Sequence, residues 1–299
     1  MVSNQALHQR WRVLRYYLSN PRYVLWLLRN KLVPDLLLPA RLKSNAWWLA
    51  ANDFVGEHAF LGEYFENAEQ EFFRNYLQPG MTFLDIGAHH GLYTLLASRR
   101  VGVTGQVIAF EPSPREVARL KTHLSLNRCT NVCIEQFALG KDERESELFI
   151  CFGKDGSGFN SLRPPNTDHT LTPLKVKVRS LDSYLSNHGI CIAKIAALKM
   201  DVEGGELDIL RGATRMLSAD MRPIIMCEVE DIRTQAWGYK ARDIFDYLES
   251  FKFSWFSVSK AGHLVPLTGD TFPQGNLIAI PSERLPIVSA LSLGLEAKL

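Results

Sequence analysis

The sequence lacks a long apolar run, and this absence excludes one class of protein at the outset. A membrane-spanning helix needs roughly 18–20 consecutive apolar residues, whereas the longest candidate here extends only from Tyr23 to Leu28. The first apolar residues are interrupted by Arg10, Arg12 and Arg15, so they do not form the uncharged core of a cleavable signal peptide. With 46% hydrophobic residues in 299, the chain can bury a full core, and we expect a soluble, cytoplasmic, globular protein.

Cysteine is scarce, and the net charge is small. The five cysteines are odd in number, scattered and mostly inside apolar, strand-like runs, which predicts free thiols in a reducing compartment. Cys129 and Cys133 have no Cys or His pair at metal-ligand spacing, so no zinc site is expected. A net charge of +2 gives little global attraction to nucleic acid, and we expect no nucleic-acid partner.

The dinucleotide fingerprint G-x-G-x-x-G is also missing. Its middle glycine lets the backbone approach a pyrophosphate, but His89 stands at that position between Gly87 and Gly91. The absence disfavours NAD and FAD, and a nicotinamide-dependent oxidoreductase is therefore kept only as an alternative function.

What the chain does contain is a strand-turn-helix pattern around residues 82–94. Asp85 ends the apolar run, Gly87 and Gly91 bracket a tight turn, and a periodic apolar segment follows. We expect Gly87 to let the backbone pass close to a bound molecule and Gly91 to let the helix start pack against the strand. Asp85 can accept hydrogen bonds from a cationic amine.

A second apolar segment, residues 106–110, is followed by Glu111 and Pro112. In a βαβ unit a carboxylate at this place lies across from the first turn and can accept hydrogen bonds from both hydroxyls of a ribose. Bidentate bonding to a charged acceptor contributes on the order of 1.5–3 kcal/mol. Either turn alone is equally well explained as an ordinary α/β loop, but together they predict a ligand that carries an adenosine.

These motifs resemble the FkbM family of S-adenosylmethionine-dependent methyltransferases. The resemblance spans residues 70–230 and is carried by residues 83–95, 105–112, 198–206, 210–213 and 222–224. It implies an α/β fold of the class I methyltransferase, Rossmann-like type: a mostly parallel seven-stranded sheet with an antiparallel last strand and helices on both faces. It also implies S-adenosylmethionine as cofactor and O-methylation of a small-molecule hydroxyl, on a sugar, a glycan or a polyketide-type product. The family commonly has Asn where this chain has His89.

The resemblance, together with the two acidic turns, predicts a cofactor site. We expect it to comprise Asp85, Gly87, Ala88, His89, His90, Gly91, Tyr93, Glu111, Pro112, Gln136, Phe137, Ala138 and Asp201. Gln136, Phe137 and Ala138 fall where related methyltransferases hold the adenine ring, although a plain strand-to-loop junction explains Phe137 as well. Asn160, Ser161 and Glu228 are candidate substrate residues. The first two lie in a predicted loop, residues 153–173, and long loops in compact domains tend to be functional.

Three acids, Asp201, Glu203 and Glu206, follow the predicted fourth core strand, residues 195–200. Ligands of open α/β sheets bind outside the carboxyl ends of the strands, so these acids are the candidate catalytic residues. A hydroxyl acceptor must lose its proton, and Asp201 is the first choice for the general base. Like-charge crowding should raise the pKa of at least one of the three.

Other roles for these acids stay open. Asp201 and Glu203 could instead bond the cofactor amine or cap the next helix, and Glu206 fits a structural role. A divalent metal held by Asp201 with Glu228 or Glu230 is a further alternative, because oxygen ligands suit magnesium. No spacing demonstrates such a site, so we assign no metal. A catalytically silent binding domain that recruits a partner is the alternative to an enzyme, and the intact turn residues argue against it.

The chain is expected to divide into three parts: an N-terminal helical extension over residues 1–78, basic in 1–50 and acidic in 53–77, a methyltransferase domain over 79–285 and a tail over 286–299.

The basic part of the extension has two interpretations. Residues 1–50 hold eight Lys and Arg against Asp35 alone, and residues 5–38 read as two helices broken near Asn20 and Pro21. These helices lie on an anionic membrane surface or contact a partner, or they pack as a lid on the catalytic domain.

Overall fold

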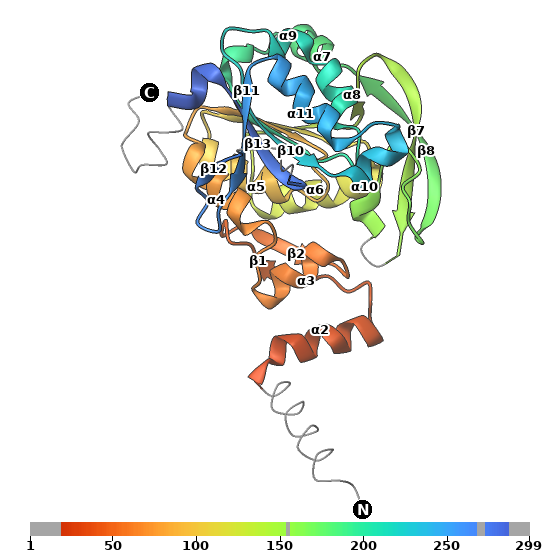
Figure 1. Cartoon of the computed structure of the whole chain (residues 1–299). Helices are drawn as coiled ribbons and strands as arrows, with labels where there is room; N and C mark the ends of the chain where they lie inside the picture. Colours follow the sequence, from red (N-terminus) through yellow and green to blue (C-terminus); the bar gives the residue numbers. More distant parts are fainter. Residues whose placement is uncertain (1–18, 154–155, 268–272, 287–299) are drawn as a thin grey trace, which may run out of the picture. The chain divides into compact units, whose positions relative to one another are not determined.

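The computed structural model describes residues 19–153, 156–267 and 273–286. The chain forms two compact units, Met1–Phe65 and Glu66–Leu299, and each is considered by itself (Figure 1). The first of the two helices predicted within residues 5–38 lies outside the described residues, as does all of the predicted tail except residue 286.

In its described residues, 19–65, the first unit combines two helices with a β-hairpin. Its elements are α2 (Pro21–Leu32), β1 (Leu38–Arg41), β2 (Trp47–Ala50) and α3 (Phe54–Leu61). The strands pair antiparallel, so the predicted helical extension also contains sheet. Asp53 begins α3 by accepting a hydrogen bond from the Gly56 N–H at 2.6 Å, which is the usual role of Asp at this position.

The second unit begins at Glu66, before the predicted domain boundary at residue 79. Its first helix, α4 (Asn67–Tyr76), carries aromatic side chains into the core. Phe73 packs edge-on against Phe83 and Tyr93, with ring centroids 5.3 and 5.9 Å apart. Burying these rings requires the rest of the unit, which explains why α4 belongs to it.

An eight-stranded sheet forms the centre of this unit. The strands are β3 (Thr82–Ile86), β4 (Gln106–Phe110), β5 (Val132–Glu135), β9 (Ile195–Met200), β10 (Ile224–Val229), β11 (Phe253–Val258), β12 (Leu264–Pro266) and β13 (Gly275–Pro281), in the spatial order β12-β11-β13-β10-β9-β3-β4-β5. The five from β5 to β10 run parallel, and β13, the last in the chain, runs antiparallel between β10 and β11. The predicted sheet is confirmed, and the short β12 adds one strand to it.

Helices cover both faces of the sheet, because its strands are apolar on both sides. Besides α4, the helices of this unit are α5 (Leu92–Val101), α6 (Pro114–Leu126), α7 (Leu181–Asn187), α8 (Glu206–Arg211), α9 (Thr214–Leu217), α10 (Asp231–Thr234) and α11 (Ala241–Ser250). Leu84 and Ile86 face a core shared with α7, α8, α9 and α11, whereas Phe83 faces one shared with α4 and α5. Residues 206–217 divide into α8 and α9 near Gly212, whose added Cβ would lie 2.1 Å from the Gly140 carbonyl oxygen.

A separate, smaller sheet begins after β5 in the chain. It contains β6 (Ala138–Leu139), β7 (Arg144–Phe152) and β8 (Thr170–Arg179) in the order β6-β8-β7, drawn in yellow-green and green in Figure 1. β8 takes up part of the predicted loop over residues 153–173, and a short 3-10 helix (Gly156–Phe159) takes up more of it. Within the described part of the chain, no helix has the length and apolar character needed to cross a membrane.

Candidate active site

Asp85 lies near the end of β3 with its side chain enclosed, at 1% exposure. Its Oδ2 accepts a hydrogen bond from the Thr94 hydroxyl on α5. Its Oδ1 is buried and has no hydrogen-bond partner among the described residues. Burial raises the pKa of Asp85, and Lys199 opposes that rise. A buried carboxylate oxygen with unused capacity is costly, and a cationic amine would satisfy it.

Lys199 provides the positive charge beside Asp85 and was not predicted as a site residue. It is 5% exposed on β9, donates to the Gly87 carbonyl at 3.1 Å and lies 3.2 Å from Asp201 Oδ2. Burial lowers its pKa, but Asp201, Asp85 and Glu66 outweigh burial and raise it above the usual value. The signal available in the sequence was a lysine inside an otherwise apolar strand.

Glu66, which was also not predicted, completes this group of charges. Its Oε2 accepts from the Tyr93 hydroxyl at 2.8 Å and its Oε1 from the Asn276 amide at 2.7 Å. Burial raises the pKa of Glu66 to about 7. Tyr93, a predicted cofactor residue, therefore points to Glu66 from the start of α5.

Glu111 follows β4 directly, and β4 is the parallel neighbour of β3. Its Oε2 accepts from the backbone N–H of His89 and its Oε1 from that of Ser113, both at 2.9 Å. Burial raises its pKa to about 7. An ionised carboxylate has about four acceptor positions, so Glu111 has capacity left for two hydroxyl groups.

The glycines of the first turn are required by close neighbours. A Cβ on Gly87, where φ is +77°, would lie 1.9 Å from the Asp201 carbonyl oxygen. A Cβ on Gly91, where φ is +93°, would lie 2.5 Å from Leu120 Cδ1 of α6. The close neighbour that requires a glycine at position 91 is thus helix α6, whereas the sequence analysis attributed this glycine to packing against the strand.

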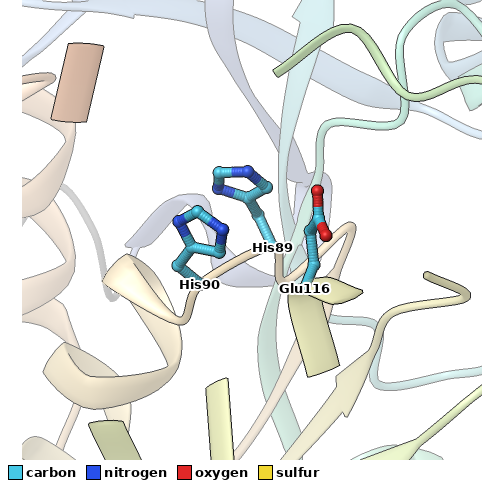
Figure 2. Close-up of side chains that lie close together, drawn as sticks. All are labelled: His89, His90 and Glu116. Carbon is cyan, nitrogen blue, oxygen red and sulfur yellow. The ribbon is translucent and has the colours of Figure 1, made fainter. Parts of the chain in front are cut away.

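His89, His90 and Glu116 lie close together beside this turn (Figure 2). The two imidazole rings stack with centroids 3.7 Å apart, and burial lowers the pKa of His90 well below its usual value. All three could offer ligand atoms within 4.8 Å of one another. However, Arg115 and Asn160 already donate to Glu116 at 2.6 and 2.9 Å, and the guanidinium would repel a cation. The cluster therefore does not have the character of a metal centre.

Of the three residues expected to hold adenine, one is exposed and two are buried. Gln136 is exposed after β5. Phe137 is 5% exposed, and its ring centroid lies 5.7 Å from Phe110 and 5.8 Å from Tyr184. Ala138 is buried and begins β6. This packing favours the strand-junction interpretation of Phe137 and leaves Gln136 as the accessible member.

The acids after β9 meet an acid from β10. Ligand oxygens of Asp201, Glu203 and Glu228 all lie within 4.8 Å of one another. Burial first, and then the charge of Asp201, raises the pKa of Glu228 to about 10 and that of Glu203 well above its usual value. Arg233, which sequence reasoning missed, lies 3.0 Å from Glu203, 3.6 Å from Glu230 and 4.0 Å from Glu228.

Glu206 differs from these acids, because its side chain accepts hydrogen bonds from the backbone of its own turn. It is 1% exposed, and its Oε1 accepts from the N–H groups of Val202 and Gly204 at 2.9 and 3.4 Å. Burial raises its pKa to about 7. These contacts fit the structural role.

Two candidate substrate residues, Asn160 and Ser161, lie between β7 and β8. They connect the group around Glu116 with the group around Glu203. Ser161 Oγ donates to the Glu203 carbonyl at 2.9 Å. Asn160 accepts from the Cys151 N–H and donates to Glu116, each at 2.9 Å. Both side chains are thus used to fix the segment.

Known proteins resemble part of this chain. The family profile described as Methyltransferase FkbM domain matches residues 85–254, more than half of the chain. "Methyltransferase 1" of Beauveria bassiana is 26% identical over 149 residues, 45% of this chain and 59% of the relative. The "AMB antimetabolite synthetase AmbE" of Pseudomonas aeruginosa is 25% identical over 211 residues, 59% of this chain and 10% of that protein. The chain therefore spans less than two thirds of either relative.

A solved structure of methyltransferase FkbM from Methylobacillus flagellatus KT is also similar, with 18% identity and a TM-score of 0.42 over 76% of this chain and 52% of the other. On the strength of the profile match, this chain belongs to the FkbM methyltransferase domain family.

Proposed function

We propose that the protein transfers a methyl group from S-adenosylmethionine to a hydroxyl of a small molecule, such as a sugar, a glycan or a polyketide-type product. The observation that carries the proposal is the pair of buried acids on adjacent parallel strands. Asp85 keeps an unpartnered oxygen among the described residues, and Glu111 keeps acceptor capacity across a glycine turn.

The residues present fit this cofactor. Asp85 would hold the amine of its amino-acid part, Glu111 the ribose hydroxyls and Gln136 the adenine. When bound, the cofactor supplies an electrophilic methyl group on a positively charged sulfur. The protein's share is chiefly orientation, which can lower the barrier by up to roughly 7–11 kcal/mol.

The acidic cluster would handle the acceptor proton. Arg233 pairs with Glu203, and Glu206 closes its own turn. Asp201 is 30% exposed in its side chain, beside Lys199, so its carboxylate is the accessible base. The raised pKa of Glu228, about 10, keeps this side chain protonated at neutral pH, so it can donate a hydrogen bond to the acceptor.

Calorimetry on the full chain tests the cofactor assignment. S-adenosylmethionine and S-adenosylhomocysteine should both bind, whereas NAD should not. Binding of NAD alone would favour the oxidoreductase. If the nucleosides bind and a broad panel of hydroxylated acceptors never gains a methyl group in mass spectra, the silent binding domain is the better explanation.

Replacing the base tests the mechanism. We expect Asp201→Asn to lower kcat by about 10²–10⁴-fold, the usual contribution of general base catalysis, while cofactor affinity changes little. Turnover should also survive chelation, since Arg233 already supplies a cation to the acids. Full activity of Asp201→Asn would remove the base assignment, and a requirement for added magnesium would support the metal alternative.

A further inference from the structure

The first compact unit exposes an unusual density of apolar side chains. Seven large ones between residues 25 and 37 are 38–71% exposed: Leu25, Leu27, Leu28, Leu32, Val33, Leu36 and Leu37. We call these seven the leucine patch. A concentration of exposed apolar side chains in one segment is typical of an interaction site in a folded protein.

The patch results from the way α2 attaches to its own unit. Trp26 is 1% exposed and stacks on Phe60 of α3, with ring centroids 5.6 Å apart. Arg29 is 4% exposed, lies over the Trp26 ring at 4.8 Å and donates to the Leu36 carbonyl at 2.6 Å. Because the tryptophan and arginine face inward, the helix directs Leu25, Leu28 and Leu32 outward.

Basic residues accompany the patch. Arg22 and Lys31 are exposed on α2, and residues 1–50 carry eight Lys and Arg against Asp35 alone. An apolar face combined with basic side chains complements an anionic lipid surface, where leucines enter the acyl boundary and cations meet the headgroups.

We propose that the leucine patch docks this protein onto an anionic membrane surface. The 12-residue helix α2 (Figure 1) would lie in the plane of the interface, because among the described residues no helix is long and apolar enough to span the bilayer. The proposal concerns the first unit and does not depend on the reaction catalysed by the second.

Vesicle co-sedimentation of the full chain tests this. The chain should bind vesicles that mix phosphatidylglycerol with phosphatidylcholine, bind pure phosphatidylcholine much less, and dissociate as salt is added. The double variant Leu28→Ser, Leu32→Ser removes side chains that are 50% and 71% exposed, and it should bind about tenfold more weakly or worse.

The matched control is Val103→Ser, Leu126→Ser, which removes side chains 89% and 43% exposed in the other unit and should bind like the wild type. Lys31→Glu, which leaves the apolar residues intact, should also weaken binding, so the test does not depend on the folding of one variant. Three results would overturn the proposal: no binding to anionic vesicles, unchanged binding of the patch variants, or a lipid-free dimer in light scattering that the double variant dissociates.

Discussion

Lys199 balances the acidic groups that surround the turn after β3. Asp201, Asp85 and Glu66 all act on its ammonium group, and the lysine is buried. We expect Lys199→Met to lower the free energy of unfolding by about 3–5 kcal/mol, because it leaves carboxylates buried without their cation. Urea denaturation measures this. Lys121→Met, at an exposed position on α6, serves as the control and should change stability by less than about 0.5 kcal/mol.

Asp85 provides a test of ligand binding at a single residue. Asp85→Asn keeps the shape of the side chain and removes its charge, so it should weaken S-adenosylmethionine binding by about 1.5–3 kcal/mol, roughly 10- to 150-fold. Calorimetry against Asp246→Asn, an exposed carboxylate on α11, separates this loss from a general effect of charge. Equal affinities of the two variants would show that Asp85 does not hold the cofactor amine.

At the scale of elements, Gly87 allows the carboxyl ends of β3 and β9 to lie close together. Gly87→Ala places a Cβ 1.9 Å from the Asp201 carbonyl oxygen, and backbone on both sides cannot yield cheaply. We expect a loss of stability above about 3 kcal/mol in urea denaturation. Gly238→Ala is the control, since φ there is also positive, at +78° with ψ at +23°, but nothing lies within 4 Å, and it should cost only about 1–2 kcal/mol of backbone strain. Similar losses in both variants would contradict the close contact.

The sequence predicted most elements of the second unit, because apolar runs that end at Gly, Pro or an acid are clear local signals. β4 over Gln106–Phe110 and β9 over Ile195–Met200 have their predicted bounds. The close approach of Gly212 to the Gly140 backbone has no local signal, because the two residues are distant in the sequence. The hairpin of β1 and β2 was missed because its strands are only four residues long.

The same distinction between local signals and distant contacts applies to the candidate site. Asp85 and Glu111 were found because each follows an apolar strand in its own local pattern. Glu66 was not predicted, because its partner Asn276 is 210 residues away along the chain. Arg233 pairs with Glu203 after β9 and with Glu230 after β10, and no local pattern reveals which acids will converge on an arginine.

At the scale of the whole molecule, buried acids make stability depend on pH. Glu66, Glu111 and Glu206 each have a pKa of about 7, raised from 4.5. A carboxyl group with a raised pKa in the fold stabilises it fully below its unfolded value and loses that contribution as pH rises through the folded one. We therefore expect the free energy of unfolding to fall between about pH 5 and about pH 8.

Glu206→Gln, which mimics the protonated form, should reduce this fall by roughly 1–3 kcal/mol, as measured by urea denaturation at both pH values. Exposed Glu249→Gln on α11 should leave the fall unchanged. A pH dependence identical to the wild type in both variants would show that Glu206 is not held in its neutral form.

Asn160 and Ser161 connect the proposed cofactor region with the proposed acceptor region. One residue is fastened to Glu116, beside the proposed nucleoside region, and the next to the Glu203 backbone among the acids. If donor and acceptor bind as proposed, displacement of these two residues would alter the binding of both. The Michaelis constants for the two substrates would then change together, and evolution toward a new acceptor by changes here would also lower donor affinity.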